Sequence, residues 1–219
     1  RPLACCLCEK GAIKNAAIAL HPKPDAPMTY TSLATGLLLA AGRGSRFDPT
    51  GAQNKLLAPL ADGTPVARAA AQRLLLSVPR VLAVVRPGAE ALAHMLNDAG
   101  CEVIFSKDAQ RGMGASLAAG VHASADAKGW IVSLADMPWI APHTIEAVAR
   151  QIDEGASIVV PVYRGKRGHP VGFGAMHGSA LAALDGDVGA RALLASSDLT
   201  TIEVDDAGVL ADVDTPSDL

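Results

Sequence analysis

The chain has 219 residues, half of them apolar but only 3% aromatic, and its formal net charge at pH 7 is −3. This length suits one α/β domain with a sizeable core built from Ala, Val, Leu and Ile. The slight negative charge does not favour nucleic acid or an anionic membrane as a partner, and no apolar run reaches the roughly 18 residues that span a bilayer.

Residues 1–27 differ from the rest of the chain. They are rich in proline and show no sustained hydrophobic period. Three of the four cysteines lie there (Cys5, Cys6 and Cys8), at spacings that suit neither a disulfide framework nor a zinc finger. We expect a disordered leader or tag before a domain that covers residues 28–219. The cysteine usage favours a reducing, cytoplasmic setting.

From residue 35 short apolar runs alternate with segments of helical period. Strands are expected at 37–40, 81–85, 102–105, 130–134 and 157–162, and helices at 64–77, 88–99, 116–125 and 142–154. A basic loop at 163–170, a strand at 171–175, short helices at 179–184 and 189–196, and a hairpin around Asp206-Ala207-Gly208 (strands 201–204 and 209–211) follow. The pattern predicts a single-domain, Rossmann-like three-layer α/β sandwich with a mostly parallel sheet.

The most informative stretch is an apolar run that ends in the glycine-rich turn Ala41-Gly42-Arg43-Gly44-Ser45-Arg46, with Lys55 further on. Glycines let the backbone turn sharply and approach a ligand closely, and exposed N–H groups can hold phosphate oxygens. Arg46 and Lys55 add positive charge where a polyphosphate would bind. The stretch therefore predicts a phosphate-binding loop.

Two known phosphate loops do not fit. A P-loop ends in Gly-Lys-Ser/Thr, which is missing. A dinucleotide fingerprint needs a third glycine where Phe47 stands, and a helix that Asp48-Pro49-Thr50-Gly51 would break. These mismatches favour a loop that wraps a nucleoside triphosphate, and they argue against an NAD-dependent oxidoreductase.

Acidic residues supply candidate metal ligands. Asp136 directly follows a hydrophobic strand, at the end where open α/β sheets bind ligands, and a carboxylate there can hold Mg²⁺. The other interpretation is a cap for the helix that follows. Asp212 and Asp214 alternate around Val213, so that both would face one side of a strand. They could complete the metal site, orient an acceptor substrate, or serve the turn before Thr215.

These residues resemble the signature of the molybdenum-cofactor nucleotidyltransferases, which have a GT-A-like core, and most closely the molybdopterin cytidylyltransferases. The resemblance runs from about residue 35 to the end of the chain and rests on several stretches in order. They are Leu39-Ala40-Ala41-Gly42 with Gly44 and Arg46, Lys55-Leu56-Leu57, Gly112-Met113-Gly114-Ala115-Ser116, Leu134-Ala135-Asp136-Met137-Pro138, Arg167-Gly168-His169-Pro170, Gly189-Ala190-Arg191 and Asp212-Val213-Asp214-Thr215-Pro216. One departure is the long insert at 47–54.

The resemblance implies roles for particular residues. Arg46, Lys55 and Asp136 would be catalytic, and Asp136 and Asp214 would hold Mg²⁺. His169, Arg167 and Asp212 would bind the acceptor. The nucleotide would be bound by Leu39, Ala40, Ala41, Gly42, Gly44, Arg46, Lys55, Gly112 and Ser116.

The implied reaction moves CMP from CTP to the phosphate of molybdopterin cofactor and releases pyrophosphate. The product could pass to a molybdenum hydroxylase. The alanine at Ala41, where the guanosine-using branch typically has glycine, favours CTP over GTP. The alternatives are GTP as the nucleotide, a sugar or polyol phosphate as the acceptor, and a non-catalytic chaperone that holds the pterin.

Overall fold

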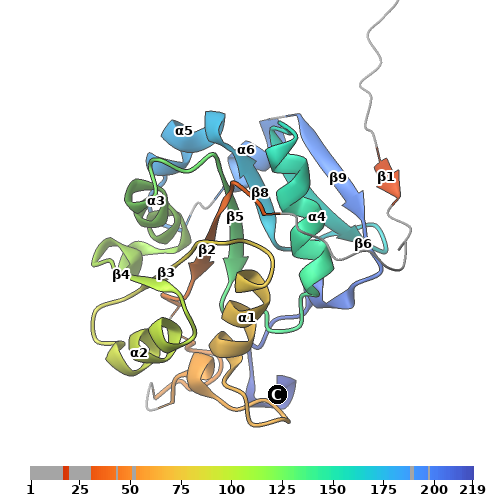
Figure 1. Cartoon of the computed structure of the whole chain (residues 1–219). Helices are drawn as coiled ribbons and strands as arrows, with labels where there is room; N and C mark the ends of the chain where they lie inside the picture. Colours follow the sequence, from red (N-terminus) through yellow and green to blue (C-terminus); the bar gives the residue numbers. More distant parts are fainter. Residues whose placement is uncertain (1–16, 20–30, 43, 51–52, 188–189, 197) are drawn as a thin grey trace, which may run out of the picture.

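The computed structural model describes residues 17–19, 31–42, 44–50, 53–187, 190–196 and 198–219 (Figure 1). Within these residues one sheet holds the strands in the order β1-β9-β6-β8-β5-β2-β3-β4, and β7 pairs with β6 beside this path. The strands are β1 Ala17–Ala19, β2 Thr35–Leu39, β3 Val81–Val85, β4 Glu102–Phe105, β5 Gly129–Leu134, β6 Ile158–Tyr163, β7 Lys166–Arg167, β8 Val171–Gly174 and β9 Leu199–Glu203.

Most neighbouring strands are parallel, as predicted. The exceptions in the described part are β8, which runs antiparallel between β5 and β6, and the short β7. The alternation of strands and helices predicts parallel pairing because each helix returns the chain to the same edge of the sheet. Strand β8 follows β6 without an intervening helix, so it returns antiparallel.

Helices cover both faces of the sheet and make three layers. They are α1 Val66–Leu75, α2 Glu90–Asp98, α3 Met113–Ala123, α4 Pro142–Asp153, α5 Gly178–Ala182 and α6 Arg191–Ser196. One buried cluster joins the sheet to α1, α2 and α4, and a second joins it to α3 and α5. The three-layer Rossmann-like prediction is confirmed.

Strand β2 shows why the sequence forms this arrangement. All five of its residues are buried, and Leu37 and Leu39 face α3 while Leu38 faces the layer of α1 and α4. Successive side chains of a strand point to opposite faces, so a strand covered on both sides reads as a continuous apolar run. Burial of each leucine side chain stabilises the folded state by roughly 1.5–3 kcal/mol. This burial fixes the strand whose end carries the glycine-rich turn.

The prediction of a hairpin around Asp206 is wrong. Residues Ala207–Leu210 form a 3₁₀ turn, and β9 pairs in parallel with β6. The buried Asp206 carboxylate accepts hydrogen bonds from Ala141 N (2.9 Å), Thr144 Oγ1 (2.8 Å) and Gly208 N (3.0 Å). The Asp-Ala-Gly pattern therefore serves the start of helix α4, a distant partner that a local turn rule does not consider.

Several other element ends differ from the prediction by one to three residues, and a short strand lies in a predicted loop. Helix α3 begins at Met113, three residues earlier than expected, directly after Gly112 with its φ of 141°. The basic loop at 163–170 contains β7, whose Lys166 and Arg167 pair with the end of β6.

The prediction that residues 1–27 are a disordered leader falls largely outside the described residues. Within that stretch the structure describes β1, which pairs in parallel with β9 at the edge of the sheet. Among the described residues, no helix combines the length and the apolar character needed to cross a membrane.

Candidate active site

The glycine-rich turn after β2 packs against the side chain of Lys55. Gly44 has a φ of 63°, and a Cβ added there would lie 3.3 Å from Lys55 Cγ. Gly44 O accepts hydrogen bonds from the backbone N–H groups of Phe47 and Asp48, and Phe47 is buried. Asn54 caps the 3₁₀ turn Lys55–Leu57 by accepting from Leu56 N. The insert at 47–54 thus begins against Gly44 with Phe47 buried, and the Lys55 side chain is directed inward.

Lys55 stands at the centre of a charged cluster. Its Nζ donates to Asp136 Oδ2 (2.7 Å), to Val213 O (2.8 Å) and to Asp214 Oδ1 (3.3 Å). Arg46 forms an ion pair with the other oxygen of Asp214. The lysine side chain is only 9% exposed, whereas that of Arg46 is 75% exposed. The two cations predicted to meet the same phosphates therefore converge on one carboxylate.

The C-terminal segment brings two acidic residues beside Asp136. Val213 is buried, and its N–H donates to Asp136 O at 2.8 Å. The alternation around Val213 leaves Asp212 and Asp214 on one side. One ligand oxygen from each of Asp136, Asp212 and Asp214 lies within 4.8 Å of the others.

This cluster has the donor chemistry for a hard divalent cation. Asp136 Oδ1 is buried and has no hydrogen-bond partner among the described residues. The pKa of Asp212 is raised, first by partial burial and then by the charges of Asp214 and Asp136. Crowded carboxylates with an unsatisfied buried oxygen are stabilised when a cation binds between them. The residues present therefore fit a divalent metal ion.

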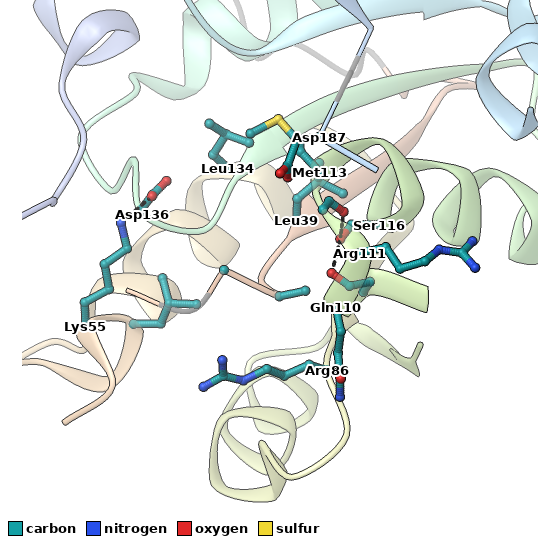
Figure 2. A pocket seen from close by; sticks show the side chains of 15 residues that line it. Leu39, Lys55, Arg86, Gln110, Arg111, Met113, Ser116, Leu134, Asp136 and Asp187 are labelled. Carbon is teal, nitrogen blue, oxygen red and sulfur yellow. Dashed lines mark hydrogen bonds and ion pairs between the residues drawn. The ribbon is translucent and has the colours of Figure 1, made fainter. Parts of the chain in front are cut away.

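A cavity of about 550 Å³ opens beside the cluster (Figure 2). This volume is in the range of small-molecule sites. Its walls come from the end of β2, the 3₁₀ turn at Lys55, the end of β3, the start of α3 and the end of β5. Seven residues predicted for the site line it: Leu39, Ala41, Gly42, Lys55, Gly112, Ser116 and Asp136.

Three residues predicted to bind nucleotide lie outside the cavity wall. Ala40 is buried on the opposite face of the sheet because side chains alternate along the chain as it leaves β2. Gly44 lies against the stem of Lys55, and Arg46 pairs with Asp214.

Ser116 lines the cavity in the first turns of α3, but its hydroxyl is already used. The Oγ atom donates to Gly112 O at 3.0 Å, and the residue is 4% exposed. Ser116 therefore shapes the wall, and the lone pairs of Oγ are what it can offer a ligand.

The acceptor residues predicted from sequence differ in position and in exposure. Asp212 belongs to the acidic cluster. His169 has a buried Nδ1 atom with no hydrogen-bond partner among the described residues, and its backbone N–H donates to Val209 O at 2.9 Å. Burial lowers the pKa of His169, while the Asp136 charge acts in the opposite direction. Arg167 is exposed on β7 and does not line the cavity.

Sequence reasoning missed several residues of the cavity wall: Leu56, Arg86, Ala109, Gln110, Arg111, Met113, Leu134 and Asp187. Arg86 directly follows β3, so the rule that identified Asp136 at the end of β5 would also have found it. Gln110 and Arg111 precede the Gly112 turn. Asp187 gives no local signal, because only the tertiary fold brings it to α3.

The fold and the site define a Rossmann-like α/β protein with a glycine-rich turn after β2 and an acidic cluster of Asp136, Asp212 and Asp214 beside a cavity. Residues 36–202 match the family described as the MobA-like NTP transferase domain, and the chain belongs to this family. It therefore carries an NTP transferase domain, which confirms the resemblance drawn from its motifs.

The chain is similar to purine catabolism protein PucB of Bacillus subtilis (strain 168), with 30% identity over 196 residues, covering 84% of this chain and 92% of that protein. The crystal structure of Rv0371c from Mycobacterium tuberculosis H37Rv has 30% identity and a TM-score of 0.73, covering 87% of this chain and 96% of the other. A manganese complex of Rv0371c has 28% identity and a TM-score of 0.69, covering 84% and 95%.

Proposed function

We propose that this chain transfers CMP from CTP to the phosphate of molybdopterin cofactor and releases pyrophosphate, with Mg²⁺ as the metal. The observation that carries the proposal is the convergence of Lys55 and Arg46 on the carboxylates of Asp136 and Asp214 beside the cavity. Family membership supports the nucleoside triphosphate, and the motif resemblance supports the pterin acceptor.

Nucleotidyl transfer requires the protein mainly to position the two substrates and to neutralise their negative charge. A phosphate oxygen of the acceptor attacks the α-phosphorus in line, the new O–P bond forms, and the bond from the α-phosphorus to the bridging oxygen breaks, so pyrophosphate leaves. The acceptor phosphate is already ionised at neutral pH, so no strong general base is required. Lys55 and Arg46 would exchange their Asp214 contacts for phosphate oxygens and stabilise the charge on the departing group.

Asp136 and Asp214 would hold the metal, with Asp212 directed to the acceptor. When bound, Mg²⁺ supplies positive charge to the phosphate oxygens. The relative Rv0371c has been crystallised in complex with manganese, which supports the use of a divalent ion. Ionised carboxylates suit both ions, so the preference for Mg²⁺ rests on the triphosphate substrate.

The proposal that the nucleotide carries cytosine, and not guanine, rests on Ala41. Its methyl group lines the cavity and narrows the space that a glycine would leave, which favours a pyrimidine. GTP is the alternative nucleotide. His169, whose Nδ1 has no partner in the described part of the chain, and Arg167 would contact the acceptor. A molybdenum hydroxylase would receive the product.

The test is pyrophosphate release measured for CTP and GTP against molybdopterin cofactor, a sugar phosphate and a polyol phosphate, each with Mg²⁺. We expect release with CTP and the pterin. Faster release with GTP would refute the base assignment, and turnover with only a sugar or polyol phosphate would refute the acceptor. Tight binding of the pterin without any pyrophosphate would indicate a chaperone.

A further inference from the structure

The segment between α5 and α6 is fastened to the start of α3. Gly186 O accepts a hydrogen bond from Gly114 N at 2.8 Å, and Asp185 Oδ1 pairs with Arg111 Nε at 2.9 Å. A Cβ at Gly114 would lie 2.9 Å from the carbonyl oxygens of both Asp185 and Gly186. The glycine turn before α3 thus leaves room for a second backbone.

Asp187 continues this contact into the cavity. Gly112 has a φ of 141°, and a Cβ there would lie 2.2 Å from Asp187 Oδ1, so only glycine lets this carboxylate rest against the turn. Asp187 lines the same cavity as Lys55 and Asp136. In the described parts of the chain, no hydrogen bond or ion pair engages its carboxylate.

The charge of Asp187 restricts which part of a bound nucleotide its carboxylate can contact. Phosphates are repelled by a carboxylate and are attracted by Lys55 at the other side of the cavity. An ionised carboxylate only accepts hydrogen bonds, so its partner in a nucleotide must be a hydroxyl or an amino group. Figure 2 shows Asp187 beside Met113 and above Leu39, with Asp136 and Lys55 to the left and Gln110 and Arg86 below. In any nucleotide the ribose lies between the phosphates and the base.

We propose that the Asp187 carboxylate accepts hydrogen bonds from the 2′- and 3′-hydroxyls of the nucleotide ribose and makes the site selective for ribonucleotides; this rests on the proposed function. Two vicinal hydroxyls match the two carboxylate oxygens. A site built to hydrogen-bond a hydroxyl rejects the analogue that lacks it, because its own polar group is then left without a partner.

The experiment measures equilibrium binding of CTP, dCTP and UTP by calorimetry with Mg²⁺ and without acceptor. The wild type should bind CTP at least about tenfold more tightly than dCTP, the ratio expected for one hydrogen bond to a charged group. In Asp187→Ala the two dissociation constants should agree within about threefold. Asp126→Asn, which alters a carboxylate exposed on the surface, should keep the wild-type ratio.

Equal binding of CTP and dCTP by the wild type, or an unchanged ratio in Asp187→Ala, would overturn the inference. So would a variant that instead loses discrimination between CTP and UTP, because the carboxylate would then read the amino group of the base. If the wild type prefers CTP to dCTP, Asp187→Ala loses that preference, and no acceptor gives pyrophosphate, the proposed function would be refuted while Asp187 would still be supported as the ribose contact.

Discussion

Replacing Asp136 by Asn is the sharpest single perturbation of the proposed site. The change keeps the shape of the side chain and removes one negative charge. In the native protein Oδ2 contacts Lys55 Nζ at 2.7 Å, and Oδ1 is buried without a partner in the described structure. An amide can still accept one hydrogen bond from Lys55, but it is a much poorer ligand for a hard divalent cation.

The magnitude follows from the balance of charges. The variant loses the ion pair with Lys55, yet it also removes repulsion from Asp212 and Asp214, and the native side chain is 21% exposed. We therefore expect the free energy of unfolding to change by no more than about 2 kcal/mol. Catalysis has no such compensation, so turnover should fall at least about a hundredfold, or about 2.7 kcal/mol of barrier.

The assay is the rate of pyrophosphate release from CTP and molybdopterin cofactor with saturating Mg²⁺, beside a urea unfolding curve for each protein. Asp126→Asn is the matched control, since it makes the same substitution at an exposed surface ion pair with Arg80. Turnover of Asp136→Asn within about threefold of the wild type would refute its role, as would an equally large loss in the control.

Three further predictions address other parts of the chain. Lys55→Ala should stay folded and lose at least about a hundredfold in pyrophosphate release, since the buried ammonium is lost; a rate near that of the wild type would remove Lys55 from the catalytic group. Ser124→Ala should lower the free energy of unfolding by about 1–3 kcal/mol in urea titration, because Trp130 Nε1 donates to Ser124 Oγ at 2.9 Å and would be left buried without an acceptor; an unchanged midpoint would contradict this. Burial raises the pKa of the Cys101 thiol to about 11 from 9.0, so stability from this group is present below pH 9 and lost as the pH rises toward 11. With the three N-terminal cysteines changed to serine, Cys101 should resist iodoacetamide at pH 8, where about one thiol in a thousand is ionised, and rapid labelling of the folded protein would argue against its burial.

The sequence was most informative where burial alone decides structure. Strand β3 is buried at every position and was predicted with the observed bounds, Val81–Val85, since a run covered on both faces must be continuously apolar. Asp136 was found by the same logic, as a charged residue placed directly after such a strand. Arg86 could have been found in this way too.

The remaining features depend on partners distant in the sequence. Asp206 looked like a turn residue, but its carboxylate holds Ala141 and Thr144 at the start of α4. Asp187 reaches the cavity only because a loop from the far end of the chain rests on Gly112. Ala40 was predicted for the site from its motif, whereas the alternation of side chains directs it to the opposite face.

The most direct test of the central claim is ³¹P NMR of the wild-type protein with CTP, Mg²⁺ and molybdopterin cofactor. We expect one equivalent of pyrophosphate for each equivalent of pterin that carries a new phosphoanhydride bond, and neither product when the cofactor or Mg²⁺ is omitted. Spectra in which CTP and the pterin phosphate stay unchanged would contradict nucleotidyl transfer to this acceptor.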